Sequence, residues 1–286
     1  MTKMIDRGIS GENTFSVILL AGDRASDPLS QISPCNRKAL LGISGQPMIT
    51  YVLKTLKAAK NLGEIAVVAN RVWEIAENSS VREWLAKNDP QSQVNFLEGA
   101  ESPASSVVLA LEEKFQESSL VLVVTADSPL LTTETLEEFC RRALSMLDVD
   151  VAVGLATEGD ICKAFPKVRR TYIRLKGGGY SGCNLFALMS GKASKAAEVW
   201  CDVEGRRKRP WQLISYFGFS TLLKVIFGRL DLQSAFNAAS CSIGLNIKAV
   251  VLDDPLAAMD VDRTEHILIA DSLLGGGEGA SAKIRS

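Results

Sequence analysis

Short apolar runs recur along the chain at the spacing of strands in an α/β protein. The first, Phe15–Gly22, is apolar apart from one serine and ends in glycine. Such a run is typical of a strand buried on both faces of a parallel sheet, because alternation disappears when neither face meets water. We predict further strands at Ile65–Ala69, Val94–Leu97, Leu120–Thr125 and Val151–Leu155, and a last one at Ala249–Leu252.

Amphipathic stretches that fit helices lie between these runs. Met48–Leu62 carries apolar residues at helical spacing, and Val107–Phe115 follows Ser102-Pro103, a typical helix start. Thr264–Leu274 has the pattern of a closing helix. Strands that alternate with helices of this length predict an α/β fold with a doubly wound, mostly parallel, Rossmann-like sheet.

The second half of the chain departs from this alternation. Tyr172–Leu175 and Cys183–Leu188 predict two strands joined by the glycine-rich turn Lys176–Tyr180, and we expect this hairpin at the edge of the sheet. A largely apolar stretch, Pro210–Leu232, follows the basic run 206–209. We predict one domain over residues 15–274 with a helical insertion at about 192–245, a flexible N-terminus at 1–14 and a disordered tail at 275–286.

Composition narrows the class of protein. Of the 286 residues, 47% are hydrophobic and 23% are charged, and the net charge is -1. This ordinary globular composition gives no reason to expect a nucleic-acid partner. The first residues lack the apolar core of a secretory signal, and the longest apolar stretches are shorter than the roughly 20 residues of a membrane span. Scattered cysteines without a C-x-x-C pair and a single histidine argue against a zinc site and fit a reduced, cytoplasmic protein.

Two polar loops follow predicted strands on what should be the same edge of the sheet. Residues 21–49 follow the first strand, and Asp127 follows the strand that ends at Thr125. In doubly wound sheets the ligand binds beyond the carboxyl ends of the strands, so we expect both loops to face one crevice. A carboxylate fixed at the end of a buried strand suits a hard cation that holds a phosphate oxygen. The alternative is that Asp127 caps a turn or a helix.

Two further carboxylates occur late in the chain, in the sequence AAMDVDRTEH. Asp260 and Asp262 lie two residues apart, which points them to the same side if they end the last strand. Magnesium sites commonly combine one or two carboxylates with substrate phosphates. We assign Asp260 to the metal, together with Asp127, and Asp262 to the cap of the helix that begins near Thr264.

Lys38 is the candidate cation of the first loop. A compact ammonium offsets the charge that develops on a leaving pyrophosphate. Arg37 is a second candidate for the same catalytic task.

These segments resemble the nucleoside triphosphate transferase family, which includes the molybdenum-cofactor guanylyl- and cytidylyltransferases and the sugar-phosphate nucleotidyltransferases. The resemblance rests on an apolar strand ending in LAG, then RKALLGISGQPMITYVLKTL, VVTADSPLL and AAMDVDRTEHILIA. It extends from about Phe15 to Leu274. It implies that the loop after Leu20, Ala21 and Gly22 wraps the nucleotide, that Lys38 contacts phosphate, and that Asp127 and Asp260 bind Mg2+.

The first loop departs from the pattern of that family. Relatives usually have Ala-Gly-Gly, a further glycine and an arginine, where this chain has Asp23 and Arg24. Glycine lets backbone N–H groups approach a phosphate, whereas an aspartate should repel a triphosphate unless it turns away or shares the cation. Arg24 is a candidate to replace the family arginine. Ser105 and Ser106 match a helix start that touches the base in relatives, although a plain helix turn also explains them.

The turn after Lys176 is the candidate acceptor side. The glycines, including Gly182, permit close approach of a substrate, and Asn184 offers a hydrogen bond. A flexible hairpin tip is the alternative. Cys183 reads as a small buried residue, because no histidine is nearby in sequence to activate it.

Residues 206–232 differ most from a generic nucleotidyltransferase. Four cations precede a stretch rich in aromatic residues, a mixture found on helices that bind anionic membrane surfaces. A buried helix pair or a homodimer interface also explains the apolar part, and we favour that explanation. A membrane contact would imply a lipid-linked acceptor.

The sequence therefore predicts a magnesium-dependent nucleotidyltransferase. It would transfer a nucleoside monophosphate from a nucleoside triphosphate to a phosphorylated small-molecule or lipid-linked acceptor, releasing pyrophosphate. One alternative is a glycosyltransferase that uses a nucleotide-sugar, for which the candidate Asp-x-Asp at a strand end lies near the C-terminus and Lys38 has no role. The other is a non-catalytic nucleotide-binding module, which the altered glycine loop suggests.

Overall fold

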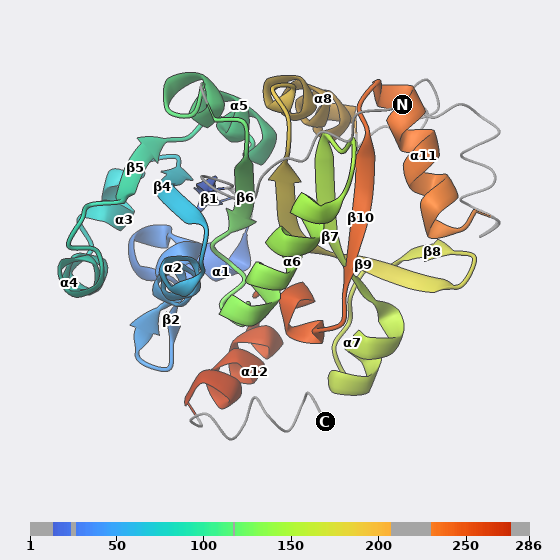
Figure 1. Cartoon of the computed structure of the whole chain (residues 1–286). Helices are drawn as coiled ribbons and strands as arrows, with labels where there is room; N and C mark the ends of the chain where they lie inside the picture. The colour runs from blue at the N-terminus through green and yellow to red at the C-terminus, as the bar shows by residue number, and fades with distance from the viewer. Residues whose placement is uncertain (1–13, 24–26, 117, 207–229, 276–286) are drawn as a thin grey trace.

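The fold is built on one large, mostly parallel sheet. The computed structural model describes residues 14–23, 27–116, 118–206 and 230–275. Within them eight strands form the sheet, in the order β10-β7-β9-β6-β1-β4-β5, with β8 paired to β9 (Figure 1). The strands are β1 (Phe15–Leu20), β4 (Leu62–Ala69), β5 (Val94–Glu98), β6 (Val121–Thr125), β7 (Val151–Thr157), β8 (Ile173–Leu175), β9 (Gly178–Leu188) and β10 (Ile247–Leu252). The predicted α/β fold with a mostly parallel sheet is confirmed.

Strand β9 is the antiparallel member of the main sheet, and its position corrects one prediction. It pairs antiparallel with β6 on one side and with β7 on the other. The expectation that the hairpin lies at the sheet edge is therefore wrong, since only β8 projects from it. The physical reason is that β9 is hydrogen-bonded on both sides, and its alternate residues Cys183, Leu185 and Ala187 are buried in the core.

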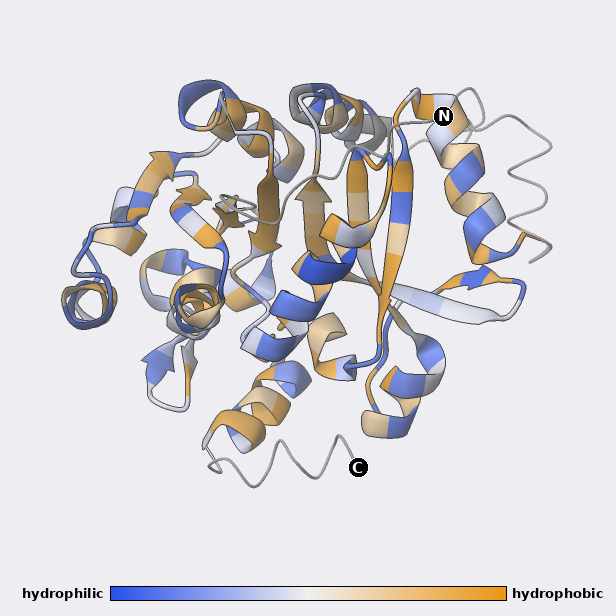
Figure 2. Cartoon of the chain, in the orientation of Figure 1, coloured by the Kyte–Doolittle hydropathy of each residue, from blue (hydrophilic) through white to orange (hydrophobic). Residues whose placement is uncertain are grey.

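Helices cover both faces of the sheet. On one face, α2 (Met48–Ala58), α4 (Ser79–Asn88) and α6 (Thr133–Ser145) pack on β1 and β4, and α6 also reaches β10. On the other, α5 (Pro103–Glu113) and α8 (Ala193–Arg206) pack on the side of β1 that carries Ile18 and Leu20. Figure 2 shows the central strands as the most hydrophobic part of the fold, with hydrophilic residues on the outer helix surfaces. Helix α2 ends at Ala58, earlier than predicted, because the chain turns at Asn61 with a φ of 59° and enters β4.

A third apolar cluster supports the segments beyond the carboxyl ends of the parallel strands. It joins Leu29, Ile43, Met259 and Val261 to Leu273 of the closing helix. The elements around it are α1 (Pro28–Gln31), the 3-10 helices η1 (Pro34–Asn36), η2 (Lys38–Leu40) and η3 (Pro255–Ala258), the small pair β2 (Gly42–Ile43) and β3 (Gln46–Pro47), α7 (Glu158–Ala164) and α12 (Thr264–Gly275). Helix α3 (Trp73–Ala76) follows β4. These short elements hold the early and late segments of the chain beside one another.

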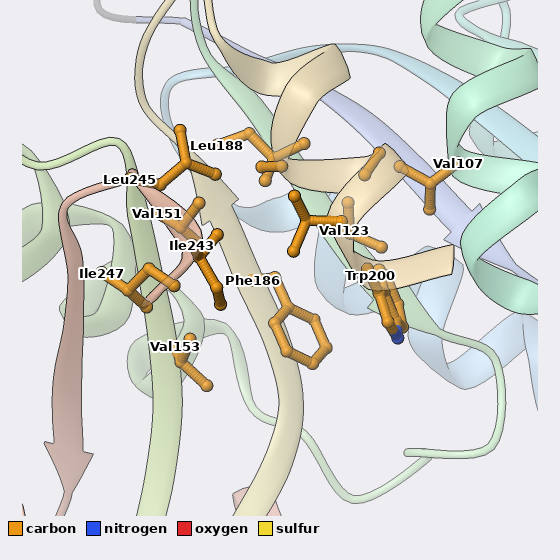
Figure 3. A pocket seen from close by; sticks show the side chains of 13 residues that line it. Val107, Val123, Val151, Val153, Phe186, Leu188, Trp200, Ile243, Leu245 and Ile247 are labelled. Atoms are coloured by element: carbon orange, nitrogen blue, oxygen red, sulfur yellow. The ribbon is translucent and has the colours of Figure 1, made fainter. Parts of the chain in front are cut away.

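An apolar pocket lies on the sheet face that carries α5 and α8, between α8 and the end of α11 (Leu232–Ile243). Figure 3 shows the side chains of Val123, Phe186 and Trp200 facing the same space, and the Phe186 and Trp200 rings lie 5.1 Å apart between centroids. Its lining is entirely apolar and contains none of the predicted site residues. This pocket is therefore not the predicted nucleotide site.

Several predictions fall wholly or mainly outside the described residues. They are the flexible N-terminus, the tail, Arg24, and the membrane or dimer surface at 206–232. Helices α8 and α11 lie within the limits of the predicted insertion. Across the part of the chain that the structure describes, no helix is both long and apolar enough to cross a membrane.

Candidate active site

Strands β1 and β6 bring the two predicted loops together. They are parallel neighbours in register from Ser16 with Val121 to Leu20 with Thr125. The backbone N–H of Ala126 continues this pairing by donating to the Leu20 carbonyl at 2.8 Å. The chain therefore leaves both strands at adjacent points, and the loop after Gly22 and the carboxylate of Asp127 lie on one rim.

The ammonium of Lys38 lies between carboxylates from distant segments. Its Nζ is 2.9 Å from Asp127 Oδ2, 2.6 Å from Asp262 Oδ1 and 3.8 Å from Asp27 Oδ2. Lys38 is only 7% exposed. Burial alone would lower the pKa of Lys38, but the charges of Asp127 and Asp262 outweigh it and raise the pKa above its ordinary value. The lysine is therefore a fixed positive charge at this rim.

Asp127 is oriented by Thr125 at the end of β6 and by the late segment that contains Val261. Thr125 donates its hydroxyl to Asp127 Oδ1 at 2.5 Å. The backbone N–H of Val261 donates to the Asp127 carbonyl at 2.8 Å, so residues 260–262 run directly past Asp127. Lys38 and the predicted carboxylate Asp127 are therefore in contact, but the late carboxylate on Lys38 Nζ is Asp262 and not the predicted Asp260.

Asp260 is the most enclosed of the late carboxylates. Its side chain is 15% exposed, it accepts a hydrogen bond from Arg170 Nη1 at Oδ1, and Asn184 Nδ2 donates to Oδ2 at 3.2 Å. Burial and the nearby charge of Asp127 raise the pKa of Asp260, despite the opposing charge of Arg170. A carboxylate whose charged form is disfavoured by a neighbouring carboxylate fits a divalent cation, which would offset both charges.

A metal at this position would need further ligands from water or from the substrate. Among the described residues, no group of three or more His, Cys, Asp or Glu side chains is arranged to hold a metal ion. Asp127 and Asp260 are two carboxylates, and Mg2+ usually completes such a pair with phosphate oxygens and water. The donor set therefore fits a magnesium ion that is bound together with a phosphate.

Asp262 was predicted to cap the helix that begins near Thr264. In the structure its carboxylate accepts a hydrogen bond from Lys38, and its side chain is 55% exposed. Burial alone would raise the pKa of Asp262, but the charge of Lys38 lowers it below its ordinary value. The expectation that Asp260 and Asp262 end the last strand is also wrong. Strand β10 ends at Leu252, and η3 stands between that strand and the two aspartates.

Asp23 and Arg37 form a buried pair beside Lys38. Arg37 is 1% exposed, and its guanidinium donates to Asp23 Oδ2 at 3.1 Å, to Glu74 Oε2 at 2.5 Å and to Asn70 Oδ1 at 3.2 Å. The other oxygen of Asp23 accepts the backbone N–H of Lys38 at 2.8 Å and the Ser30 hydroxyl at 2.8 Å. The unusual aspartate therefore turns into the loop, and Arg37, predicted as catalytic, holds it there.

The predicted nucleotide-binding residues lie around the same loop but differ in their exposure to solvent. Leu20 and Ala21 are buried, and Ala21 donates its N–H to the Val68 carbonyl, whereas Gly22 is exposed. The hydroxyl of Ser105 completes a capping box with Ser102 at the start of α5. The hydroxyl of Ser106 accepts the N–H of Ala100 at 3.0 Å. Both serine hydroxyls therefore have local structural partners, and their contact with a base stays a prediction.

The predicted acceptor residues meet the carboxylate cluster through Asn184. This residue has a φ of 53° and contacts Asp260. Gly182 is exposed, with no atom within 4 Å of the position that a Cβ would take. Cys183 is 1% exposed, and burial raises its pKa to about 12, in keeping with a core residue rather than a nucleophile.

Three contributors were not found from the sequence. Arg170 binds Asp260 and Ser181, Glu74 binds Arg37, and Thr125 orients Asp127. Thr125 directly precedes the motif and could have been read as its support. Arg170 follows another arginine in an irregular segment, and nothing local distinguishes it from its neighbours.

Comparisons with known proteins show the family and the fold of the chain. A model of the MobA-like NTP transferase domain matches residues 17–175, which is more than half of the chain. The solved structure of a hypothetical transferase from Thermus thermophilus is 28% identical, with a TM-score of 0.74, and the match covers 89% of this chain and 99% of that one. No curated protein matches the sequence significantly.

Two more distant structures show the fold alone. The 4-diphosphocytidyl-2C-methyl-D-erythritol synthase of Anaerococcus prevotii is 13% identical with a TM-score of 0.55, over 92% of this chain and 96% of that one. A CMP:2-keto-3-deoxy-manno-octonic acid synthetase, complexed with CTP, is 12% identical with a TM-score of 0.56, over 92% and 99%. Both are similar over nearly their whole length. This chain belongs to the family of MobA-like NTP transferase domains and is an enzyme of the nucleotidyltransferase family.

Proposed function

We propose that the protein is a magnesium-dependent nucleotidyltransferase that transfers a nucleoside monophosphate from a nucleoside triphosphate to a phosphorylated acceptor. The observation that carries this proposal is the contact of Lys38 Nζ with Asp127 and Asp262, beside Asp260. A fixed cation from the first loop and carboxylates from two distant segments meet at one rim of the sheet. A triphosphate and a divalent ion need this combination of charges.

Each side chain has a distinct role in the proposed reaction. Asp127 and Asp260 would hold Mg2+, which when bound neutralises phosphate charge. Lys38 binds the β- and γ-phosphates and stabilises the charge that develops on them. Asp23 and Arg37 fix the backbone at Lys38, so Arg37 acts through position rather than by contact with the phosphates. Gly22, together with the backbone at Leu20 and Ala21, lines the nucleotide side.

The proposed chemical step is an in-line displacement. An oxygen of the acceptor phosphate attacks the α-phosphorus and forms a new P–O bond. The bond from the α-phosphorus to the bridging oxygen breaks, and pyrophosphate leaves with the electron pair. The acceptor phosphate is already anionic near neutral pH, so no general base is required. Alignment and charge neutralisation supply most of the catalysis.

The acceptor would bind on the side of Asn184 and Gly182, where the backbone is open to close approach. Two of the similar solved structures are a diphosphocytidyl synthase and a synthetase in complex with CTP. CTP is therefore the first nucleotide to test. A lipid-linked acceptor is retained only as a member of the acceptor panel, because the segment that suggested it lies mainly outside the described residues.

The surroundings of Asp23 weaken the argument for a non-catalytic nucleotide-binding module. That reading rested on the charge of Asp23 facing the triphosphate. In the structure the Asp23 side chain is 7% exposed and neutralised by Arg37. The altered loop therefore does not oppose the binding of a triphosphate.

A pyrophosphate-release screen tests the proposal. CTP, GTP, ATP and UTP with Mg2+ are combined with sugar phosphates, polyol phosphates and phosphorylated lipids. One nucleotide should release pyrophosphate only when a suitable acceptor is present, and Asp127→Asn should abolish this release while the circular dichroism spectrum stays native. Release of a nucleoside diphosphate from nucleotide-sugars instead would indicate glycosyl transfer. Near-normal rates in Asp127→Asn would remove the metal assignment.

A further inference from the structure

Arg170 reaches the carboxylate cluster from the acceptor side. It lies between α7 and β8, and its Nε donates to Ser181 Oγ of β9 at 3.2 Å while Nη1 donates to Asp260. The side chain is 9% exposed. A guanidinium carries five N–H donors in a planar fork, more than these two contacts use. Arg170 therefore has donors to spare beside Asn184, which binds the other oxygen of Asp260.

The charges of the cluster are divided between two cations. Lys38 is shared by Asp127, Asp262 and, at 3.8 Å, Asp27, while Arg170 is placed on Asp260. Four carboxylates against two side-chain cations leave two net negative charges, which a divalent ion would neutralise. A cluster that has bound a divalent ion therefore no longer repels an anionic acceptor.

A metal ion and Arg170 would compete for the same atom. Asp260 Oδ1 accepts from Arg170, and its Oδ2 accepts from Asn184. A cation that binds Asp260 must weaken the ion pair, because the positive charges of the metal and the guanidinium repel each other. The guanidinium would then have donors free for another anion a short distance away.

We propose that Arg170 binds the anionic group of the acceptor, and that a divalent ion frees it for this task by replacing it on Asp260. The inference rests on the proposed function and deepens it. Arg170 becomes a specificity-determining residue for acceptors that carry a phosphate, phosphonate or carboxylate. The planar fork of arginine suits such groups because it can donate two parallel hydrogen bonds.

A purely structural ion pair would behave in the opposite way toward metal. If Arg170 only held Asp260 in position, its removal would leave the carboxylate misplaced and weaken metal binding. If Arg170 competes with the metal, its removal leaves Asp260 more available and strengthens metal binding. The direction of the change in metal affinity therefore separates the two roles.

Mn2+ binding to the full chain, followed by electron paramagnetic resonance of the free ion, tests the competition. Arg170→Ala should bind Mn2+ about tenfold more tightly, the size of one lost hydrogen bond to a charged group. Arg174→Ala is the matched control, because Arg174 is 67% exposed and pairs with Glu158 instead. Its Mn2+ affinity should equal that of the wild type. Unchanged or weaker binding in Arg170→Ala would overturn the proposal.

Inorganic phosphate is the probe for the anion site. Titrated calorimetrically into Mn2+-loaded protein, phosphate should bind about tenfold more weakly to Arg170→Ala than to the wild type or Arg174→Ala. Arg170→Lys keeps the charge beside Asp260 but loses the fork, so its loss should be smaller than that of alanine. Phosphate affinity that depends on Lys38→Ala and not on Arg170 would place the anion on the nucleotide side and contradict the inference.

Two measures keep the outcomes decisive. Thermal unfolding shows whether each variant is folded. If Arg170→Ala is not, Arg170→Lys decides, and unchanged phosphate affinity in that variant counts against the proposal. Neither binding assay needs turnover. Failure of the Arg170 variants alone removes this inference, whereas failure of the wild type to release pyrophosphate removes the proposed function.

Discussion

The carboxylate of Asp23 accepts the backbone N–H of Lys38 at 2.8 Å. Its other oxygen binds the guanidinium of Arg37 at 3.1 Å, and that arginine is almost wholly buried. The Asp23 side chain thus fixes the backbone of Lys38, the residue to which we assign the catalytic charge. The loop keeps its geometry through an ion pair rather than through the freedom of a glycine backbone.

Replacing Asp23 by glycine should therefore harm the protein even though it restores the residue of the family pattern. Asp23→Gly leaves the buried Arg37 with one carboxylate fewer and releases the backbone at Lys38. We expect the free energy of unfolding to fall by about 3 kcal/mol and triphosphate binding to weaken. Urea denaturation and calorimetric titration with the nucleoside triphosphates measure the two effects.

Asp23→Asn is the control for that experiment, because its amide oxygen can still accept the Lys38 N–H. Its loss of stability should be smaller than that of Asp23→Gly. Tighter triphosphate binding by Asp23→Gly, at unchanged stability, would show that the aspartate opposes the nucleotide instead of supporting the loop.

Lys38→Ala should lower the rate of pyrophosphate release about 100-fold, because the variant loses the charge that stabilises the transferring phosphates. Lys87→Ala is the control, since Lys87 is an exposed lysine that pairs with Glu83 on α4. Steady-state assays give the rates of both. A rate in Lys38→Ala within a fewfold of the wild type would remove this residue from the mechanism.

The same lysine predicts part of the pH profile. The pKa of Lys38 is raised, so its ion pairs are complete below its ordinary pKa and are lost only as the pH rises through the higher folded value. Lys38 should therefore cause no loss of wild-type rate between about pH 7 and pH 10. Because Asp127 and Asp262 keep the Lys38 amine protonated, Lys38 should also react slowly with amine-directed reagents. Rapid loss of activity with an amine-directed reagent at pH 8, prevented in Lys38→Arg, would contradict this.

Five of the six cysteines should divide into two classes of reactivity, whereas Cys201 is intermediate in exposure. Cys140 and Cys183 are buried, and burial raises the pKa of each thiol to about 12. Cys35, Cys162 and Cys241 are exposed. Iodoacetamide at pH 8, followed by mass spectrometry, should label the exposed three in the native protein and reach Cys140 and Cys183 only after denaturation. Labelling of native Cys183 would reopen its reading as a nucleophile.

Asp89 should contribute to the free energy of unfolding at neutral pH, and this contribution should be lost in acid. It accepts from Lys57 Nζ at 2.8 Å and from the backbone N–H groups of Gln93 and Val94. Burial alone would raise the pKa of Asp89, but these donors lower it below its ordinary value. A lowered pKa stabilises the fold above the ordinary pKa, and this contribution is lost as the pH falls through the folded value.

Asp89→Asn should therefore cost about 2 kcal/mol of unfolding free energy at pH 7. The difference from the wild type should shrink as the pH falls below about 4. Denaturant unfolding at several pH values measures it, with the exposed Asp253→Asn as the control. A difference that stays constant from pH 7 to pH 3 would mean that the charge of Asp89 does not contribute.

The fold was predictable to the extent that it depends on local pattern. Apolar runs identified β1, β4, β6 and β7 because strands buried on both faces carry few polar positions. The edge strand β5 was identified from a shorter run that includes Asn95. The place of β9 between β6 and β7 was not predictable in the same way. An apolar run shows that a strand is buried, but its neighbours depend on long-range packing that one segment does not encode.

Candidate site residues could be predicted where they lie in the loop that follows a strand. Ion pairs between residues of different loops could not be predicted. Asp127 closely follows β6, and Lys38 lies in the loop after β1, which are the positions that the resemblance to a family indicated. The pairing of Asp23 with Arg37, and of Arg170 with Asp260, depends on loop conformations. Asp260 and Asp262 were assigned to a strand end, because the sequence did not reveal that η3 intervenes.

The hydrogen bond from Val261 to Asp127 makes the site depend on a segment that is synthesised late. Lys38 and its partner Asp262 are separated by 224 positions. A chain emerging from the ribosome can pair β1 with β4 long before residue 262 has been made. Until then the carboxylate cluster lacks Asp260 and Asp262. The active site that we propose can therefore be completed only after the ribosome has passed this late segment.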